Sequence, residues 1–221
     1  MLALKYFEQN TSKNKIITNR QELGEREIIT FLNISEFYGE KINLTCGKKV
    51  LLDLGCGDQH LRKAVENRNI NYLGLDIFDT NFEFDKLPLE NNSVDIIISL
   101  AVIEHISNPN NFLSEILRVL KPGGIVYIST PNWYFSYKEF FNDPTHVKPY
   151  NPTTLETILL MYGFNNPKTY PGVRCKPKWY YLGKYRFIKG NYLLPFRGET
   201  KYVPKFLKGR STSIFAIATK L

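Results

Sequence analysis

The pattern of apolar and polar positions along the chain predicts short strands that alternate with helices. Apolar runs of strand length lie at residues 50–54, 71–77, 95–100, 125–130 and 213–219, and residues 164–170 are expected to lead into a further strand. Hydrophobic residues at helical spacing lie within residues 25–38, 61–65, 112–120 and 155–162. The run 95–100 is apolar on both faces, as a central parallel strand should be. This alternation is typical of an α/β protein with a doubly wound, mostly parallel sheet.

Capping residues predict where two of the helices begin. Asn108 is a good N-cap, and Pro109 suits the first helical position. Asn151 and Pro152 repeat the arrangement, and Gly163 marks the end of the second helix.

A glycine-rich turn directly follows the first predicted strand. The strand ends in Asp53, and Gly55 and Gly57 let the backbone approach a ligand or take a positive φ. A dinucleotide-binding turn would carry a third glycine where this chain has His60, and Asp58 would repel a pyrophosphate. Carboxylates suit instead the positively charged amino group of a methionine-like ligand. The turn therefore indicates a cofactor with an aminoacyl end rather than NAD.

Four later motifs accompany this turn. They are Asp76 at the end of the second strand, Asp85 before Leu87-Pro88-Leu89, Ile103-Glu104-His105, and Leu120 to Gly124. A carboxylate placed like Asp76 can accept both hydroxyls of a ribose. In this order over residues 48–131, the five motifs resemble those of the class I S-adenosylmethionine-dependent methyltransferases, in particular the group that acts on small molecules and sugars.

The resemblance implies a seven-stranded Rossmann-like sheet with an antiparallel last strand, and S-adenosyl-L-methionine as the cofactor. It places the methionine end near Asp53, the ribose on Asp76, the adenine near Asp85 and the sulfonium beside Leu100. The residues that it assigns to cofactor binding are Asp53, Gly55, Cys56, Gly57, Asp76, Ile77, Asp85, Lys86, Leu87 and Leu100. A short third strand is expected to end at Asp85, whose other interpretation is a solvated acid in a turn.

The pair Glu104-His105 has three interpretations. His105 can act as a general base, the pair can form half of a metal site, or both residues can hold a loop through hydrogen bonds to the backbone. In some members of the resembling group, the metal site has a further acid one helical turn earlier, where this chain has Ala101. We therefore expect no metal and take the loop-holding role as the default, and we keep both residues as candidate catalytic groups.

The segment after the fifth predicted strand contains the first candidate for a general base. Residues 143–150 read Asp-Pro-Thr-His-Val-Lys-Pro-Tyr, which resembles a segment of methyltransferases for glycan and quinone-type substrates. In that setting His146 lies near the acceptor, and an imidazole that titrates near neutrality can take a hydroxyl proton. The alternative is that His146 only fixes the loop. Asp143 can orient His146 or cap the turn.

Length and composition fit one domain with a substantial core. The chain has 221 residues, of which 43% are hydrophobic and 23% charged. We expect an N-terminal helical cap at 1–48, a cofactor-binding half at 49–131 and an acceptor-side half at 132–221. The start of the chain lacks a signal-peptide core, and its three cysteines have no metal or redox spacing, so we expect a cytoplasmic protein.

Positive charge is concentrated near the C-terminus. Residues 168–210 contain twelve basic residues and one acid, whereas the whole chain has a formal net charge of +8. Aromatic residues are interleaved with this charge in the insertion 173–210, which could grip an anionic acceptor, a nucleic acid or an anionic surface. We favour an acceptor-side lid, and we disfavour nucleic acid because no RNA-binding motif is present. A solvated insertion anchored by its aromatics is the other interpretation.

The predicted function is O-methylation of a sugar or glycan-linked acceptor. The alternatives are methylation of another small hydroxylated or phenolic compound, and a non-catalytic methyltransferase-fold module that binds nucleic acid or an anionic surface. The acceptor and the oligomeric state do not follow from the sequence.

Overall fold

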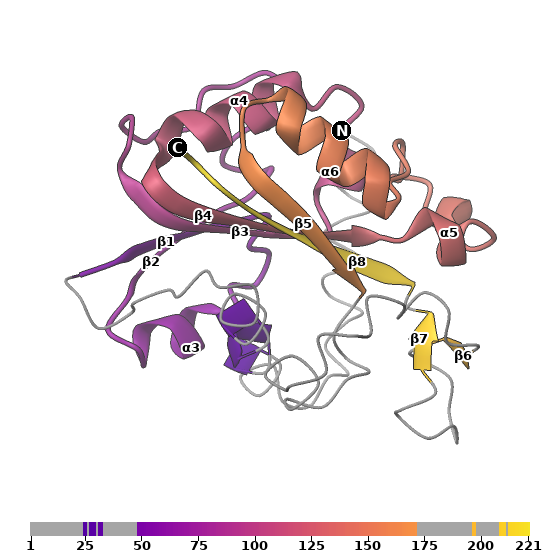
Figure 1. The fold of residues 1–221 in the computed structure, drawn as a ribbon. Coiled ribbons are helices and arrows are strands. Elements are labelled where there is room, and N and C mark those ends of the chain that lie inside the picture. The colour runs from indigo at the N-terminus through magenta and orange to yellow at the C-terminus, as the bar shows by residue number, and fades with distance from the viewer. Residues whose placement is uncertain are drawn as a thin grey trace.

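The computed structural model describes residues 24–25, 27–29, 31–32, 48–171, 196–197, 208–210 and 212–221. Its centre is a six-stranded sheet with helices on both faces (Figure 1). The strand order is β2 (Asn71–Leu75), β1 (Val50–Leu54), β3 (Val94–Leu100), β4 (Leu120–Pro131), β8 (Ser213–Thr219) and β5 (Asn165–Pro171). Strands β2, β1, β3 and β4 are parallel, and β8 is antiparallel to both of its neighbours. The doubly wound, mostly parallel sheet and its antiparallel last strand are confirmed.

Helices bury both faces of the sheet. Helices α4 (Asn110–Val119) and α6 (Pro152–Met161) cover one face, and α3 (Arg62–Glu66) lies on the other with the helical residues among 24–32 (Figure 1). Successive residues of a strand point to opposite faces, so Leu52 packs under α4 and α6 while Leu51 packs on the other side. This two-sided burial explains why the central strands β1 and β3 carry apolar residues on both faces. The predicted helix over 25–38 is confirmed as far as residue 32.

Local capping sets the ends of α6 as predicted. Asn151 Oδ1 accepts from Thr154 N at 2.9 Å, and Thr154 Oγ1 accepts from Asn151 N, which completes a capping box. Gly163 has φ +88° and donates its N–H to Leu160 O at the other end.

Helix α4 begins one residue later than predicted, with Pro109 at the N-cap position. Asn108 Oδ1 still accepts from Asn110 N, so Asn108 organises this start from one position earlier.

Short elements follow the ends of β3 and β4. They are η2 (Ile103–His105), α5 (Trp133–Ser136) and η3 (Phe140–Asn142). A separate parallel pair is formed by β6 (Phe196–Arg197) and β7 (Lys208–Arg210). Most of the predicted basic insertion lies outside the described residues.

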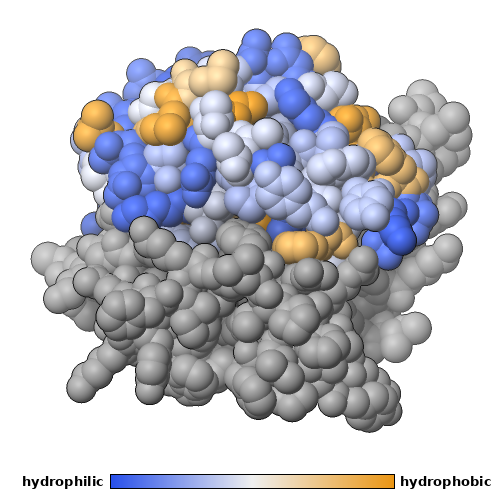
Figure 2. All heavy atoms as spheres, turned by 45° about the vertical axis from the view of Figure 1, so that its right-hand side comes forward, coloured by the Kyte–Doolittle hydropathy of each residue, from blue (hydrophilic) through white to orange (hydrophobic). Residues whose placement is uncertain are grey.

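The described surface is mixed in character. On the face shown in Figure 2, hydrophobic residues form small groups within a mainly hydrophilic surface. Among the described residues, no helix combines the length and apolar content needed to cross a bilayer.

The predicted third strand is absent, and this corrects the expectation of seven strands for the described residues. Residues 76–93 form turns in place of a strand paired with β2. Their backbone groups bond locally: Thr80 N donates to Asp76 O, and Asp85 N donates to Asn81 O. The segment is too short for both a strand and a crossover, so its polar groups are satisfied by turns.

Replacing the cap of α6 tests the local stability of this helix. We expect Asn151→Ala to lower the free energy of unfolding by about 1 kcal/mol, because Thr154 N loses its side-chain acceptor. Chemical denaturation measures the change. The matched control is Thr157→Ala on the exposed face of the same helix, which should change stability little. Equal losses in the two variants would contradict a role for the cap.

Candidate active site

The ends of three parallel strands converge at one edge of the sheet. Leu54, the last residue of β1, pairs with Leu75 of β2 and with Ser99 of β3. The glycine-rich turn after Leu54 therefore lies between Asp76 and Leu100. Ligands of open α/β sheets bind at this edge, so the structure brings together the residues that were predicted for the amino, ribose and sulfonium ends of the cofactor.

Backbone geometry fixes the glycine-rich turn. Gly55 has φ +78°, and a Cβ there would lie 2.2 Å from Cγ2 of Val102. Gly57 has φ +49°, with open space where its Cβ would be. Its N–H donates to Asp76 Oδ2 at 2.7 Å, which ties the turn to the end of β2. The turn is thus packed against the chain at Gly55 and open toward a ligand at Gly57.

Asp53 is a buried carboxyl group under this turn. Its side chain is 2% exposed, and Tyr72 Oη donates to its Oδ2 at 2.6 Å. Burial raises the pKa of Asp53 to about 6, although the hydrogen bond from Tyr72 favours the ionised form. A bound cationic group would favour ionisation further, so this position suits an ammonium group.

The remaining residues predicted for the cofactor lie in different surroundings. Cys56 is buried, and burial raises the pKa of its thiol to about 12, which agrees with a packing role. Ile77 is half-exposed beside Asp76. Asp85 and Lys86 are exposed, and Asp85 Oδ2 accepts from Asn81 N at 2.8 Å within its own turn.

Leu87 belongs to the core under α4 rather than to the open edge. It is 4% exposed, and its N–H donates to Glu115 Oε2 of that helix. The structure therefore places the Asp53, Gly57 and Asp76 group together, and it shows no contact that joins the 85–87 segment to that group.

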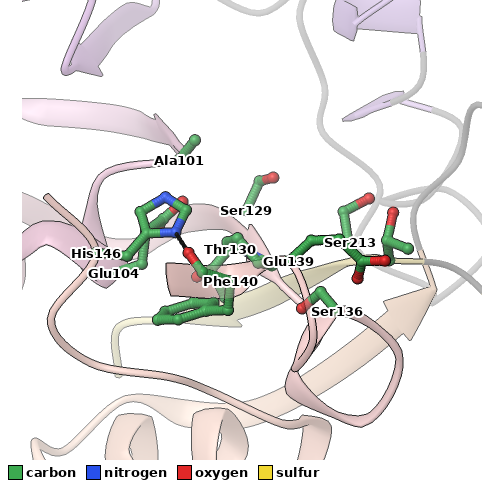
Figure 3. A pocket seen from close by; sticks show the side chains of 11 residues that line it. Ala101, Glu104, Ser129, Thr130, Ser136, Glu139, Phe140, His146 and Ser213 are labelled. Atoms are coloured by element: carbon green, nitrogen blue, oxygen red, sulfur yellow. Dashed lines mark hydrogen bonds between the residues drawn. The ribbon is translucent and has the colours of Figure 1, made fainter. Parts of the chain in front are cut away.

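A cavity of about 660 Å³ lies at the same edge, beside the ends of β3 and β4. Figure 3 shows Glu104, His146 and Phe140 on one side of it, with Ser136, Glu139 and Ser213 on the other. Its walls come from β3 and β4 ends, η2, α5, η3 and β8; the lining residues are Ala101, Glu104, Ser129, Thr130, Pro131, Ser136, Glu139, Phe140, His146, Thr212 and Ser213. Because Val102 contacts Gly55, the cavity adjoins the cofactor turn.

Three of the candidate catalytic residues form one cluster in the cavity wall. The rings of His105 and His146 lie 4.7 Å apart between centroids. Ligand atoms of Glu104, His105 and His146 all lie within 4.8 Å of one another. Burial raises the pKa of Glu104 to about 8, and burial followed by the neighbouring His146 lowers the pKa of His105. Near neutral pH the cluster therefore has two neutral members, the carboxylic acid of Glu104 and the imidazole of His105.

Backbone hydrogen bonds bring this cluster together. Val147 N and Lys148 N donate to Glu104 O at 2.9 and 3.1 Å. Thr145 O accepts from Nδ1 of His105 at 3.1 Å. Both histidines were candidates from the sequence, but their contact joins segments about 40 residues apart, and no local motif predicts it. Sequence reasoning also missed the hydroxyl side chains of Ser129, Ser136 and Ser213 in the cavity.

The sheet order, the antiparallel β8 and the glycine-rich turn at the edge define a Rossmann-like methyltransferase fold. A family model described as a methyltransferase domain matches residues 26–169. The chain belongs to this methyltransferase domain family.

Individual relatives agree with this class. A probable S-adenosylmethionine-dependent methyltransferase of Mycolicibacterium smegmatis is 28% identical over 136 residues, which cover 54% of this chain and 53% of the relative. A mitochondrial ubiquinone biosynthesis O-methyltransferase of Dictyostelium discoideum is 39% identical over 79 residues, 35% of this chain and 23% of the relative. A solved SAM-dependent methyltransferase from Archaeoglobus fulgidus has a TM-score of 0.59 at 20% identity, covering 90% of this chain and 94% of that one. The chain spans about half the length, or less, of these two curated relatives.

The residues at the strand ends fit S-adenosylmethionine. Open space above Gly57 leaves room for a ligand against the backbone, and Asp76 lies beside it as an acceptor for ribose hydroxyls. Asp53 provides negative charge for an ammonium group. The donor set thus matches the chemistry of the two ends of this molecule.

Adding a methyl group at Gly57 tests whether the open space is a ligand site. We expect Gly57→Ala to weaken S-adenosylmethionine binding at least tenfold, because the new Cβ enters the space of the ligand. The positive φ should cost only about 1 kcal/mol of stability. Calorimetry measures the affinity. Gly123→Ala is the matched control, since Gly123 also has a positive φ and open space but lies in β4 away from this edge. Unchanged affinity in Gly57→Ala would rule out this placement.

Asp53 should make cofactor affinity depend on pH. An acid whose pKa is about 6 is ionised above that value, so its attraction for an ammonium group is present at pH 8 and lost as the pH falls toward 5. We expect the affinity of wild type to fall over this range. Asp53→Asn should bind more weakly at pH 8 and show a flatter profile. Parallel profiles for the two proteins would mean that Asp53 does not contact the amino end.

Proposed function

We propose that this chain transfers a methyl group from S-adenosylmethionine to a hydroxyl oxygen of a small acceptor bound in the cavity. The observation that carries this proposal is the contact between the two sites. Val102 packs against Gly55 of the cofactor turn, and its neighbour Ala101 lines the cavity. An acceptor in the cavity would therefore lie beside the end of β3, where the resemblance places the sulfonium.

For this reaction, the protein has to align the acceptor oxygen with the methyl group and assist the loss of one proton. S-adenosylmethionine supplies a methyl group on a cationic sulfur, and that sulfur keeps the electron pair of the broken C–S bond. The acceptor oxygen forms the new bond to the methyl carbon and loses its hydrogen as a proton. In this mechanism Nε2 of His146 takes the proton. Nδ1 of the same ring donates to Phe140 O at 2.7 Å, so Nε2 is the nitrogen that can accept.

The cavity wall supports an acceptor with several hydroxyl groups. Ser129 and Ser213 line the cavity with hydroxyl-bearing side chains, Ser136 Oγ can still accept although it donates to Asn132 O, and Glu139 adds a carboxylate. Together with the 143–150 segment, these groups favour a sugar or glycan-linked acceptor. The name of the Dictyostelium relative favours the second candidate, a phenolic compound, and Phe140 offers such a ring an aromatic wall.

Several wider expectations belong to the same proposal. We infer a small-molecule or glycan partner, a cytoplasmic location and a basic insertion that approaches the acceptor or an anionic surface. A non-catalytic module would bind the cofactor without transferring its methyl group.

A screen with labelled S-adenosylmethionine tests the proposal. Wild type should transfer label to at least one member of a panel of sugars, glycan fragments and catechols. We expect His146→Ala to lower kcat by about 10²–10⁴-fold, the usual contribution of assisted proton transfer, and to leave cofactor affinity unchanged. Thr157→Ala serves as the active control.

Two results would overturn parts of this proposal. Cofactor binding without transfer to any hydroxylated acceptor would favour the non-catalytic module. Full activity of His146→Ala would assign His146 to holding the loop.

A further inference from the structure

The wall of the cavity contains a buried carboxyl group that the described part of the fold leaves without a hydrogen bond. Glu104 is 0% exposed, and neither of its carboxyl oxygens has a hydrogen-bond partner of ordinary geometry among the described residues. The hydroxyl of Thr130 lies near enough to favour the charged form of Glu104, although it makes no ordinary hydrogen bond there. Such a group is costly to the fold and favours a ligand that supplies the missing partner.

No lysine or arginine side chain pairs with Glu104 among the described residues. Asp143 adds negative charge nearby, and the buried hydroxyl of Tyr150 also lies in its field. A ring nitrogen of His105 and one of His146 lie within 4.8 Å of a carboxyl oxygen of Glu104. Burial, followed by the neighbouring His146, lowers the pKa of His105, which disfavours a positive charge on that ring. The surroundings therefore lack a fixed cation for this carboxyl group.

The described cavity wall as a whole is acidic rather than basic. Its eleven lining residues include two acids, Glu104 and Glu139, and neither a lysine nor an arginine. Figure 3 shows Glu104 beside His146 on one side of the cavity and Glu139 on the other. A site lined by one sign of charge attracts ligands of the opposite sign, so this wall favours a cationic group over an anionic one.

We propose that the cavity binds an acceptor that carries a protonated amino group, and that Glu104 is the counter-ion of this ammonium group. An ammonium group has three N–H donors, so it can satisfy the carboxyl oxygens of Glu104 and also the hydroxyl of Thr130. The identity of this ligand as the acceptor rests on the proposed methyl transfer, whereas the ammonium site itself does not.

The neighbouring imidazole narrows the acceptor to an amino alcohol. A ring nitrogen of His146 lies within 4.8 Å of a carboxyl oxygen of Glu104, so an amino group and a hydroxyl on adjacent carbons can reach both residues at once. The ammonium nitrogen has no lone pair and cannot attack the methyl group. The hydroxyl oxygen therefore remains the nucleophile, and its proton passes to His146. An amino sugar combines these two groups with the further hydroxyls that suit the cavity wall.

Matched sugars test the ammonium site. Protein loaded with S-adenosylhomocysteine, which has no methyl group to transfer, is titrated by calorimetry at pH 6.5. The probes are glucosamine, glucose and glucuronic acid, which are cationic, neutral and anionic, and the galactose series repeats the comparison. We expect the amino sugar to bind about 10–100-fold more tightly than the neutral sugar, as for a hydrogen bond to a charged group. The acidic sugar should bind more weakly than the neutral one.

Glu104→Gln separates a counter-ion from a group that only forms hydrogen bonds. Glutamine keeps the size of the side chain and its ability to form hydrogen bonds, but it cannot become negative. We expect this variant to lose the preference for the amino sugar and to keep its affinity for the neutral sugar. Glu90→Gln is the matched control, because Glu90 is exposed and lies outside the cavity wall, and it should keep the preference. Circular dichroism and S-adenosylmethionine binding show whether each variant is folded.

Proton release gives a second readout of the same contact. Burial raises the pKa of Glu104 to about 8, so at pH 6.5 its carboxyl group holds a proton in the free protein. An ammonium group stabilises the ionised form and displaces this proton to solvent. Calorimetry in buffers of different ionisation enthalpy should show proton release by wild type and Glu90→Gln, and none by Glu104→Gln. Release that persists in Glu104→Gln would contradict the assignment.

The outcomes separate this proposal from the proposed function. Wild type that binds no amino sugar, or that prefers the neutral or acidic sugar, overturns the ammonium site even when a hydroxyl acceptor is methylated. A preference that survives in folded Glu104→Gln overturns the role of Glu104. Amino-sugar binding that depends on Glu104 supports the site even when no methyl group is transferred, and in that case the proposed function fails alone.

Discussion

The carbonyl oxygen of Glu104 accepts two backbone hydrogen bonds, from Val147 N and Lys148 N, and the wall of the cavity depends on this contact. Residues 143–149 have no strand or helix of their own, so their position comes from contacts with the end of β3. The chain makes that end available by a sharp change of direction at Ala101, which has φ +58°. Thr145 O then contacts Nδ1 of His105, and the ring of His146 lies against that of His105 at an angle of 57°. The carbonyl oxygen of Glu104 thus positions the loop, while Thr145 O and Phe140 O hold the rings of His105 and His146.

Two buried glutamates show how differently this fold treats a carboxylate. Glu115 of α4 pairs with Arg118 at 2.6 Å and also accepts from Leu87 N. The hydrogen bond from Arg118 outweighs burial and holds the pKa of Glu115 below its usual range. No basic group pairs with Glu104 among the described residues, and burial raises the pKa of its carboxyl group to about 8. A carboxylate that only stabilises the fold is satisfied within it, so the unsatisfied Glu104 is a sign of function.

Local chemistry accounts for what the sequence predicted well. The cap at Asn151, the helix end at Gly163 and the turn from Asp53 to Gly57 all depend on residues within a few positions of one another. Strand identity likewise follows from continuous apolar runs. The prediction of a third strand ending at Asp85 was wrong. The residues before Asp85 contain no continuous apolar run, and the prediction rested on the resemblance alone. The contact of Glu104 with His146 was also beyond reach, because it depends on how β3 and β4 pair and on the path of the loop between α5 and α6.

The direction of β8 explains why the acceptor side lies where it does. In a wholly parallel sheet, this strand would begin at the edge opposite the strand ends. Because β8 is antiparallel to β4, its first residue, Ser213, pairs with Pro131 at the last position of β4. Thr212 and Ser213 can therefore line the cavity together with Ser129 and Thr130. The same reversal brings the residues directly before β8 to the edge at which β4 ends, so that two segments about 80 residues apart in the chain form one cavity wall.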